Sequence, residues 1–254
     1  MIKMKAFDLF NKIDEMIPKE LALKNDDIGY HGQLNPKNLD IKDIKIMMDL
    51  YPEYDTYNKD TLIITHHPPK FNPKTPIYTI HSNWDIIDGG ANDALAESLN
   101  LKVIDYFDKT TKIGRICKGN TDINKLLLKI DSNFRIKKNN NDINSVRVVN
   151  YKDTIIKNIA VISGFGLNNL EYIKLAKKLN MDLLISGDLT QAGAVLARNI
   201  GISIIDTNHH SCEIPGLIKL EKTIKKIGIP TEIIDIGLPW KDINLNSIKN
   251  KEDD

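Results

Sequence analysis

Residues 61–69 read TLIITHHPP, a short apolar run that ends directly in two adjacent histidines. A run of this length, rich in Ile and Thr and followed by turn-forming residues, is typical of a strand buried on both faces. Similar Ile-rich runs occur elsewhere in the first half of the chain, and we expect strands there as well. These runs cover residues 44–50, 77–81 and 102–107.

Helical patterns alternate with the predicted strands. The N-terminal segment predicts a helix that stops near Pro18, and DGGANDALAESLN predicts one that ends at Asn100. Residues 24–36, KNDDIGYHGQLNP, predict a polar loop. In the second half we expect strands over residues 113–119, 145–149, 158–164, 181–187, 202–207 and 231–236. We expect helices there over residues 123–130, 168–180, 190–201 and 214–228.

Three features complete this prediction. The last helix, 214–228, has Pro215 in its first turn, a position that suits proline. Residues 137–142, KKNNND, predict a surface loop, and the tail 249–254 predicts a frayed end.

Strands that alternate with helices predict an α/β fold with largely parallel sheets. The order of elements divides the chain into two α/β domains. Residues 1–110 together with 214–254 form the domain that carries His66, His67 and Asp85, and residues 111–213 form the second domain.

Composition excludes several classes of protein. The 254 residues carry 35 Lys and Arg against 34 Asp and Glu, a net charge of +1, without the basic excess of a protein that coats polyanions. No apolar run approaches the roughly 20 residues that span a bilayer. The N-terminal segment carries Asp8 and Asp14 and is no signal peptide, and two cysteines, Cys117 and Cys212, are too few for a disulfide framework. We therefore expect a cytoplasmic globular protein.

Four of the six histidines form two adjacent pairs, His66–His67 and His209–His210. Each pair directly follows a predicted strand, and this edge of an open α/β sheet is where sites form. One such pair after a strand is more often only a hydrogen-bonded feature of a loop. Adjacent histidines in extended backbone point to opposite sides, so a pair serves two metal ions more naturally than one.

Carboxylates follow two of the histidines that end apolar runs, His81 and His209. Asp85 follows His81 by four residues, and Glu213 follows His209 by four. Imidazole and carboxylate ligands suit Zn²⁺, Mn²⁺ or iron, and a bridging carboxylate can hold two cations roughly 3.5–4 Å apart. The combination predicts a metal site rather than two unrelated loops.

Three separated stretches carry a family resemblance. THHPP (65–69), HSNWDIIDGGANDALAESLNL (81–101) and DTNHHSCEIPGL (206–217), in this order, resemble the Nif-three-like dinuclear-metal family, whose members are often named GTP cyclohydrolase I type 2 homologues. NDDIGYHGQ (25–33) resembles an Asp-Asn-x-Gly loop of this family, with Asp27 in place of Asn. The resemblance covers nearly the whole chain, and the length matches the short form without an inserted domain.

The resemblance implies a ligand set and an architecture. Two divalent ions (Zn, Fe, Mn or similar) would bind between two similar three-layer α/β domains, and six chains would form a toroidal homohexamer. Asp85 and Glu213 would bridge the ions, and His81 and Glu213 are the candidates for proton transfer. The metal ligands implied are His66, His67, Asp85, His209 and Glu213.

Three nearby features stay open. His210 is a candidate substitute for His209, and Cys212 is either a buried small residue or a soft extra ligand. SGFG (163–166) corresponds to a Gly-rich segment of the family, where Phe165 interrupts the run of small residues; it is either a backbone cradle or an ordinary strand-to-helix turn.

The implied activity is hydrolysis by metal-activated water, with opening of the GTP imidazole ring and release of formate. No nucleotide-binding motif is present, and Lys70 and Lys74 are candidates only for phosphate contacts. One alternative is a regulatory factor associated with single-stranded DNA and lacking cyclohydrolase activity, which the +1 charge and low aromatic content disfavour. Another is metal storage or delivery. Five protein ligands shared by two ions leave positions open to water, which favours catalysis over a structural site.

Overall fold

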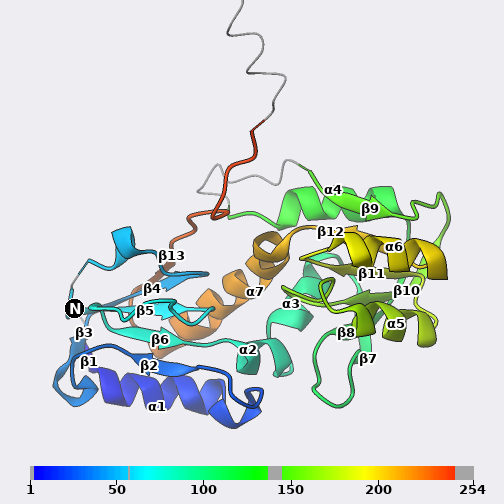
Figure 1. The fold of residues 1–254 in the computed structure, drawn as a ribbon. Helices are drawn as coiled ribbons and strands as arrows, with labels where there is room; N and C mark the ends of the chain where they lie inside the picture. Colours follow the sequence, from blue (N-terminus) through cyan, green and yellow to red (C-terminus); the bar gives the residue numbers. More distant parts are fainter. Residues whose placement is uncertain (1–2, 57, 137–144, 244–254) are drawn as a thin grey trace, which may run out of the picture.

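The computed structural model describes residues 3–56, 58–136 and 145–243. These residues form two separate mixed sheets with helix α7 (His209–Ile224) running between them, shown in orange in Figure 1. The prediction of two α/β units is therefore confirmed. No helix in the described ranges has both the length and the apolar character needed to cross a membrane.

The first sheet has five strands in the order β13-β4-β5-β6-β2. The four strands β13, β4, β5 and β6 are parallel, and β2 pairs antiparallel with β6 at the edge. All five residues of β5 are buried, as its unbroken apolar run predicts. The strands are β2 (Gly29–His31), β4 (Asp43–Met47), β5 (Thr61–Thr65), β6 (Ile77–Thr79) and β13 (Thr231–Ile233).

Two helices cover one face of this sheet. Leu9 and Ile13 of α1 (Ala6–Met16) share a core with Leu217 and Leu220 of α7 and with Ile64 of β5. The opposite face is covered by side chains that lie outside the helices, Leu50, Phe71, Ile234 and Ile236. A small two-stranded sheet of β1 (Met4–Lys5) and β3 (Asp40–Ile41) adjoins α1.

The second sheet has six strands in the order β7-β8-β10-β11-β12-β9. Its centre, β10 to β12, is parallel, whereas β7, β8 and β9 pair antiparallel. The strands are β7 (Lys102–Tyr106), β8 (Arg115–Thr121), β9 (Arg147–Val149), β10 (Ile156–Val161), β11 (Leu183–Ser186) and β12 (Ser203–Asp206).

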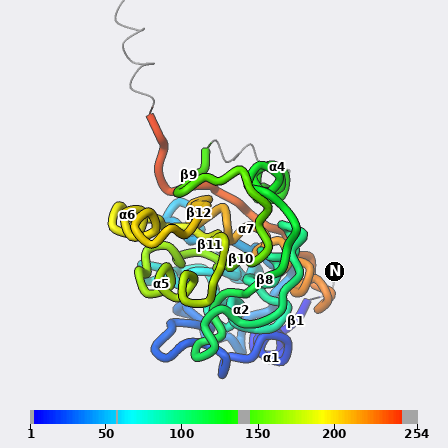
Figure 2. Tube along the Cα trace, turned by 90° about the vertical axis from the view of Figure 1, so that its right-hand side faces the viewer, coloured from blue at the N-terminus to red at the C-terminus, as the bar shows by residue number. Residues whose placement is uncertain are grey.

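Helices cover both faces of the second sheet. One face packs against α5 (Leu170–Lys178) and α6 (Gln191–Ile200), and the other against α3 (Ala91–Ser98) and α4 (Ile123–Asn133). Figure 2 shows α5 and α6 on one side of these strands and α4 on the other. The remaining helical elements are α2 (Ser82–Ile86), η1 (Lys19–Leu21), η2 (Pro36–Asn38), η3 (Pro52–Tyr54) and η4 (Lys225–Ile227).

The structure differs from the sequence prediction at three places that matter for the site. Helix α7 begins at His209, five residues earlier than predicted, because Asn208 caps it by accepting a hydrogen bond from the Ser211 amide. Pro215 therefore lies inside the helix and not in its first turn. The short elements β2 and α2 were also missed, since both depend on long-range contacts of loop-like sequence.

Sheet membership also bears on the two predicted domains. Strand β7, which lies within residues 1–110, pairs with β8 in the second sheet, whereas β13 joins the first sheet. The domain boundaries 1–110 with 214–254 and 111–213 stay a prediction. The predicted loop 137–142 and frayed tail 249–254 lie outside the described residues.

Candidate metal centre

The predicted histidines follow strands of both sheets, whereas Asp85 lies in α2 and Glu213 in α7. His66 and His67 follow β5, and His81 follows β6 and begins the turn into α2. His209 opens α7 three residues after the end of β12. The backbone amides of His66 and His67 donate to the carbonyls of Met47 and Met48 at 3.0 Å, which continues the parallel pairing past the strand end. The carboxyl edges of the two sheets thus meet where the histidines gather.

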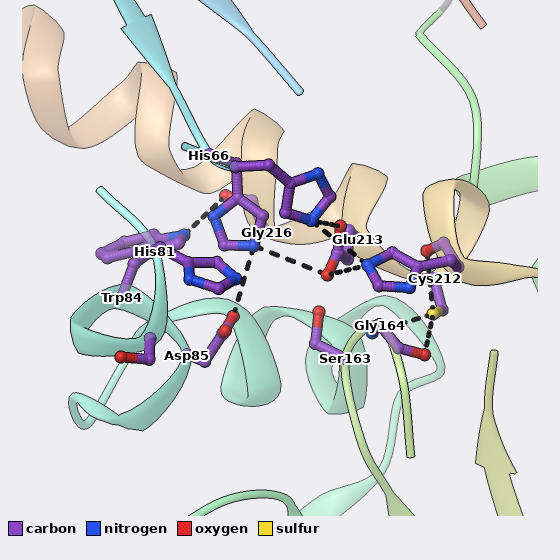
Figure 3. Close-up of polar contacts among 12 residues, drawn as sticks. His66, His81, Trp84, Asp85, Ser163, Gly164, Cys212, Glu213 and Gly216 are labelled. Atoms are coloured by element: carbon purple, nitrogen blue, oxygen red, sulfur yellow. Dashed lines mark hydrogen bonds and ion pairs between the residues drawn. The ribbon is translucent and has the colours of Figure 1, made fainter. Parts of the chain in front are cut away.

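Glu213 lies at the centre of the cluster (Figure 3). Its carboxylate is 3.1 Å from His209 Nε2, 3.2 Å from His67 Nε2 and 3.5 Å from His66 Nε2. His67 and His209 bring their Nε2 atoms to 3.2 Å of one another. Because α7 begins at His209, this histidine and Glu213 stand one helical turn apart on the same face.

Each of these three histidines is held by its other ring nitrogen. Nδ1 of His66 lies 2.9 Å from the Ile80 carbonyl oxygen, that of His67 lies 2.9 Å from Asp49, and that of His209 lies 2.7 Å from Asp188. An N–H at Nδ1 that donates to such an acceptor leaves the Nε2 lone pair free. This arrangement is characteristic of histidines that bind metal ions.

Asp85 and His81 complete the cluster on the side of the first sheet. Asp85 Oδ1 lies 3.7 Å from His66 Nε2, and Asp85 is 8% exposed. The His81 ring lies 5.2 Å from that of His66 and 5.5 Å from that of His67, while its Nδ1 lies 2.8 Å from Asp26. Two overlapping sets of side chains have atoms close enough to hold an ion: His66, His67 and His81, and His67, His209 and Glu213.

The carboxylates of the cluster favour positive charge on the histidines beside them. Burial by itself lowers the pKa of His67, but the Glu213 and Asp49 carboxylates outweigh it and raise that pKa to about 10. Burial likewise opposes protonation of His209, yet Glu213 and Asp188 raise its pKa to about 11. Burial favours the neutral form of Glu213, but the histidines around it hold its pKa well below the usual range. Positive charge is therefore strongly favoured around Glu213.

Buried polar atoms without hydrogen bonds point to the same conclusion. Among the described residues, His66 Nε2 and Asp85 Oδ1 are inaccessible to solvent and have no hydrogen-bond partner. Glu213 Oε2 is also inaccessible, and although it lies 3.2 Å from His67 Nε2 it forms no hydrogen bond there. Such atoms are costly to bury, and burial raises the pKa of Asp85. One imidazole nitrogen and two carboxylate oxygens are a suitable donor set for Zn²⁺, Mn²⁺ or iron, so the residues fit a metal centre.

His210 and Cys212 face away from the cluster. His210 Nε2 lies 2.9 Å from Asp235, so this histidine does not take the place of His209. Cys212 is fully buried in the core of the second sheet, where its sulfur accepts from the Gly164 amide at 3.1 Å. Burial raises the pKa of its thiol well above the usual value. Lys70 and Lys74, the candidates for phosphate contacts, are exposed.

The SGFG turn follows β10 and packs against Glu213. Its amides are already used: Ser163 donates to Asn92 Oδ1 at 2.8 Å, Gly164 donates to Cys212, and Gly166 donates to Ser186 Oγ at 3.0 Å. The backbone cradle weighed from the sequence is therefore not available at these three amides.

Sequence reasoning missed the three carboxylates that orient histidines. Asp49 follows β4, Asp188 follows β11, and Asp26 precedes β2. Asp188 lies in LLISGDLTQ (183–191), where a polar residue follows a buried strand as in the two histidine motifs, and Asp26 lies in the NDDIGYHGQ motif. Position at a strand end was thus an available signal for Asp49 and Asp188.

Known proteins are similar to this chain in both sequence and fold. The family model Duf34/NIF3 (NGG1p interacting factor 3) matches residues 4–237. The chain therefore belongs to the Duf34/NIF3 family, as its motifs predicted. A GTP cyclohydrolase 1 type 2 homologue of Methanothermobacter thermautotrophicus is 36% identical over 242 residues, which are 95% of this chain and 97% of the relative. A homologue of the same name from Methanocaldococcus jannaschii is 30% identical and covers 92% of this chain and 99% of its own.

Solved structures agree with this assignment. Reduced HcgD from Methanocaldococcus jannaschii has a TM-score of 0.77 at 27% identity, over 94% of this chain and 100% of its own. Protein SA1388 from Staphylococcus aureus has a TM-score of 0.74 at 21% identity, over 94% of this chain and 99% of its own, and shows the likeness of fold alone.

Proposed function

We propose that this protein is a dinuclear-metal hydrolase whose metal ligands are His66, His67, Asp85, His209 and Glu213. The observation that carries the proposal is the position of Glu213, a buried carboxylate within 3.5 Å of three imidazole nitrogens that belong to three differently anchored histidines. Both of its oxygens face imidazoles, which suits a carboxylate that bridges two ions. Asp85 adds a second carboxylate on the side of His66.

Two divalent ions held here would lower the pKa of a water molecule and polarise the bond under attack. The chain itself supplies the group that moves protons. His81 is about one-third exposed, and Asp26 holds its Nδ1, so its Nε2 remains available for a proton at the edge of the cluster. We assign proton transfer to His81 in preference to Glu213, since both oxygens of Glu213 face the imidazoles of the proposed ligands, where they would hold the ions.

The substrate class that we propose is a small molecule, with GTP as the first candidate. Support comes from relatives named GTP cyclohydrolase 1 type 2 homologue, three of which match over more than nine-tenths of this chain. In that reaction water would add to the purine imidazole ring and formate would leave.

Incubation of the metal-loaded protein with GTP, followed by measurement of formate, tests the activity. We expect release of formate, and replacement of His81 by Gln should lower the rate about 10²–10⁴-fold with the metal content unchanged. If formate is absent with zinc, manganese and iron, GTP is not the substrate. If His81→Gln loses a metal ion, His81 is a ligand and not the proton-transfer group.

The family resemblance further supports a toroidal homohexamer located in the cytoplasm. Sedimentation velocity should then give the mass of six chains of 28.8 kDa each. A regulatory role with single-stranded DNA is the second candidate, and the net charge of +1 gives it little electrostatic support.

A further inference from the structure

Four buried polar atoms without partners gather at the metal centre, and the fourth comes from the second sheet. They are His66 Nε2, Asp85 Oδ1, Glu213 Oε2 and the hydroxyl oxygen of Ser163. Ser163 is 3% exposed and follows β10 in the SGFG turn. Figure 3 shows its hydroxyl on the side of the turn that faces Glu213.

Hydrogen bonds connect the Ser163 backbone, through Asn92, to the backbone of Asp85, and the next residue of the turn packs against Glu213. The Ser163 amide donates to Asn92 Oδ1 at 2.8 Å, and the Asn92 side chain in turn donates to the Asp85 carbonyl at 2.8 Å. On the other side, Gly164 lies so close to Glu213 that a Cβ atom there would be 2.3 Å from Oε1. Asn92 is 1% exposed, so this link between the two sheets is rigid.

Metal ions would satisfy three of the four atoms but not the fourth. A nitrogen and two carboxylate oxygens are ordinary ligands, whereas a neutral serine hydroxyl is not among the ligands that Zn²⁺ favours. A hydroxyl beside cations directs its oxygen toward them and its hydrogen away, so it is oriented to donate. An acceptor on a bound small molecule would satisfy this hydroxyl.

We propose that Ser163 donates a hydrogen bond to an anionic oxygen of the ligand that the metal centre binds. This inference rests on the proposed dinuclear centre and adds a binding residue to it. Ser186 supplies a matched contrast, because its hydroxyl in the same neighbourhood is satisfied by the Gly164 carbonyl at 3.1 Å and the Gly166 amide at 3.0 Å.

The experiment compares wild type, Ser163→Ala and Ser186→Ala, with inorganic phosphate as the anionic probe. Thermal unfolding of the metal-free proteins comes first. Ser163→Ala should leave the midpoint unchanged or raise it, since it removes a hydroxyl without a partner, whereas Ser186→Ala should lower it. Loss of stability in Ser163→Ala equal to that in Ser186→Ala would mean that the hydroxyl has a partner within the chain, which overturns the proposal.

Phosphate is then titrated into cobalt-substituted wild type and Ser163→Ala, and the visible spectrum of the cobalt ions is followed. Both proteins should hold the same amount of cobalt, and phosphate should bind about tenfold more weakly to Ser163→Ala. If the two proteins bind phosphate equally well, or if the wild type holds cobalt but no phosphate, the role of Ser163 is overturned but the metal centre is not. A wild type that holds no cobalt overturns the metal centre itself.

Discussion

Gly164 packs so closely against Glu213 that a side chain at position 164 would displace the Glu213 carboxylate. A Cβ atom on Gly164 would lie 2.3 Å from Glu213 Oε1 and 3.1 Å from His209 Nε2. The glycine also has a φ of +76°, in the left-handed region. The turn after β10 therefore forms one wall of the proposed metal centre, and this contact yields the first prediction.

Gly164→Ala should displace the Glu213 carboxylate and abolish binding of at least one metal ion. Gly201→Ala is the matched control, because Gly201 has a similar φ of +70° but no atom within 4 Å of the added Cβ. Both variants should lose about 1 kcal/mol of stability through backbone strain, but only Gly164→Ala should lose metal. Metal analysis and thermal unfolding of the two proteins measure this. Equal metal content in both variants would show that metal binding does not depend on the close contact between Gly164 and Glu213.

The two histidines that open α7 should differ sharply in effect. His209→Ala removes a group 3.1 Å from Glu213 and should lower metal affinity more than a hundredfold, since it removes a ligand and not only its support. His210→Ala should keep the metal, because His210 faces Asp235. Equilibrium dialysis against a metal buffer compares the two variants. If His210→Ala loses as much metal as His209→Ala, the assignment of ligands in this helix is wrong.

Replacement of a carboxylate that orients a histidine ligand should lower metal affinity, although the carboxylate itself does not bind the metal. Asp49→Asn weakens the support of His67 and should reduce affinity about 10–100-fold. Asp235→Asn makes the same change beside His210, outside the cluster, and should leave affinity unchanged. The same dialysis measures both variants, and no difference between them would argue against orientation of His67 by Asp49.

Metal binding should release protons. His67 and His209 have raised pKa values of about 10 and about 11, so both are protonated at pH 7 in the metal-free protein. A metal ion needs the lone pair at Nε2. Burial lowers the pKa of His66, but the Glu213 and Asp85 carboxylates outweigh it and raise that pKa as well, so we expect release of at least two protons per chain and tighter binding as pH rises. Calorimetric titration in buffers with different heats of ionisation counts these protons. Metal binding without proton release would mean that the ion does not bind the Nε2 atoms of His67 and His209.

The same two pKa values give the metal-free protein a definite pH dependence. A histidine whose pKa is higher in the folded state than its ordinary 6.5 stabilises the fold fully below pH ~6.5. That stabilisation is lost as pH rises through the folded values of about 10 and about 11. The free energy of unfolding of the metal-free protein should therefore fall as pH rises from 7 to 11. Urea denaturation across this range measures it.

Much of the site was predictable because its signals are local. His66 and His67 follow a run of five buried residues, and this pattern alone identifies a strand end. The pairing of these carboxylates with their histidines was not predictable in the same way, because Asp49 is 18 residues from His67 and Asp26 is 55 residues from His81. Such pairs form only when strands from different parts of the chain are arranged in a sheet.

The start of α7 was mispredicted for a physical reason. Pro215 suits a first helical turn, because proline lacks the amide hydrogen that a helix interior uses. Here Asn208 caps the helix earlier, with a φ of +61°, and the proline lies within it. The additional turn is the one that places His209 and Glu213 on a common face. The prediction therefore failed at the point where the helix serves the site.

The central claim is a dinuclear metal centre built around Glu213, and the number of metal ions per chain tests it most directly. Wild type and Glu213→Gln, produced without a histidine tag, should be compared by inductively coupled plasma mass spectrometry. We predict two ions per chain in the wild type and their loss in Glu213→Gln, which keeps the shape of the side chain but removes its charge. A wild type without bound metal, or a Glu213→Gln variant that holds both ions as tightly as the wild type, would contradict the account.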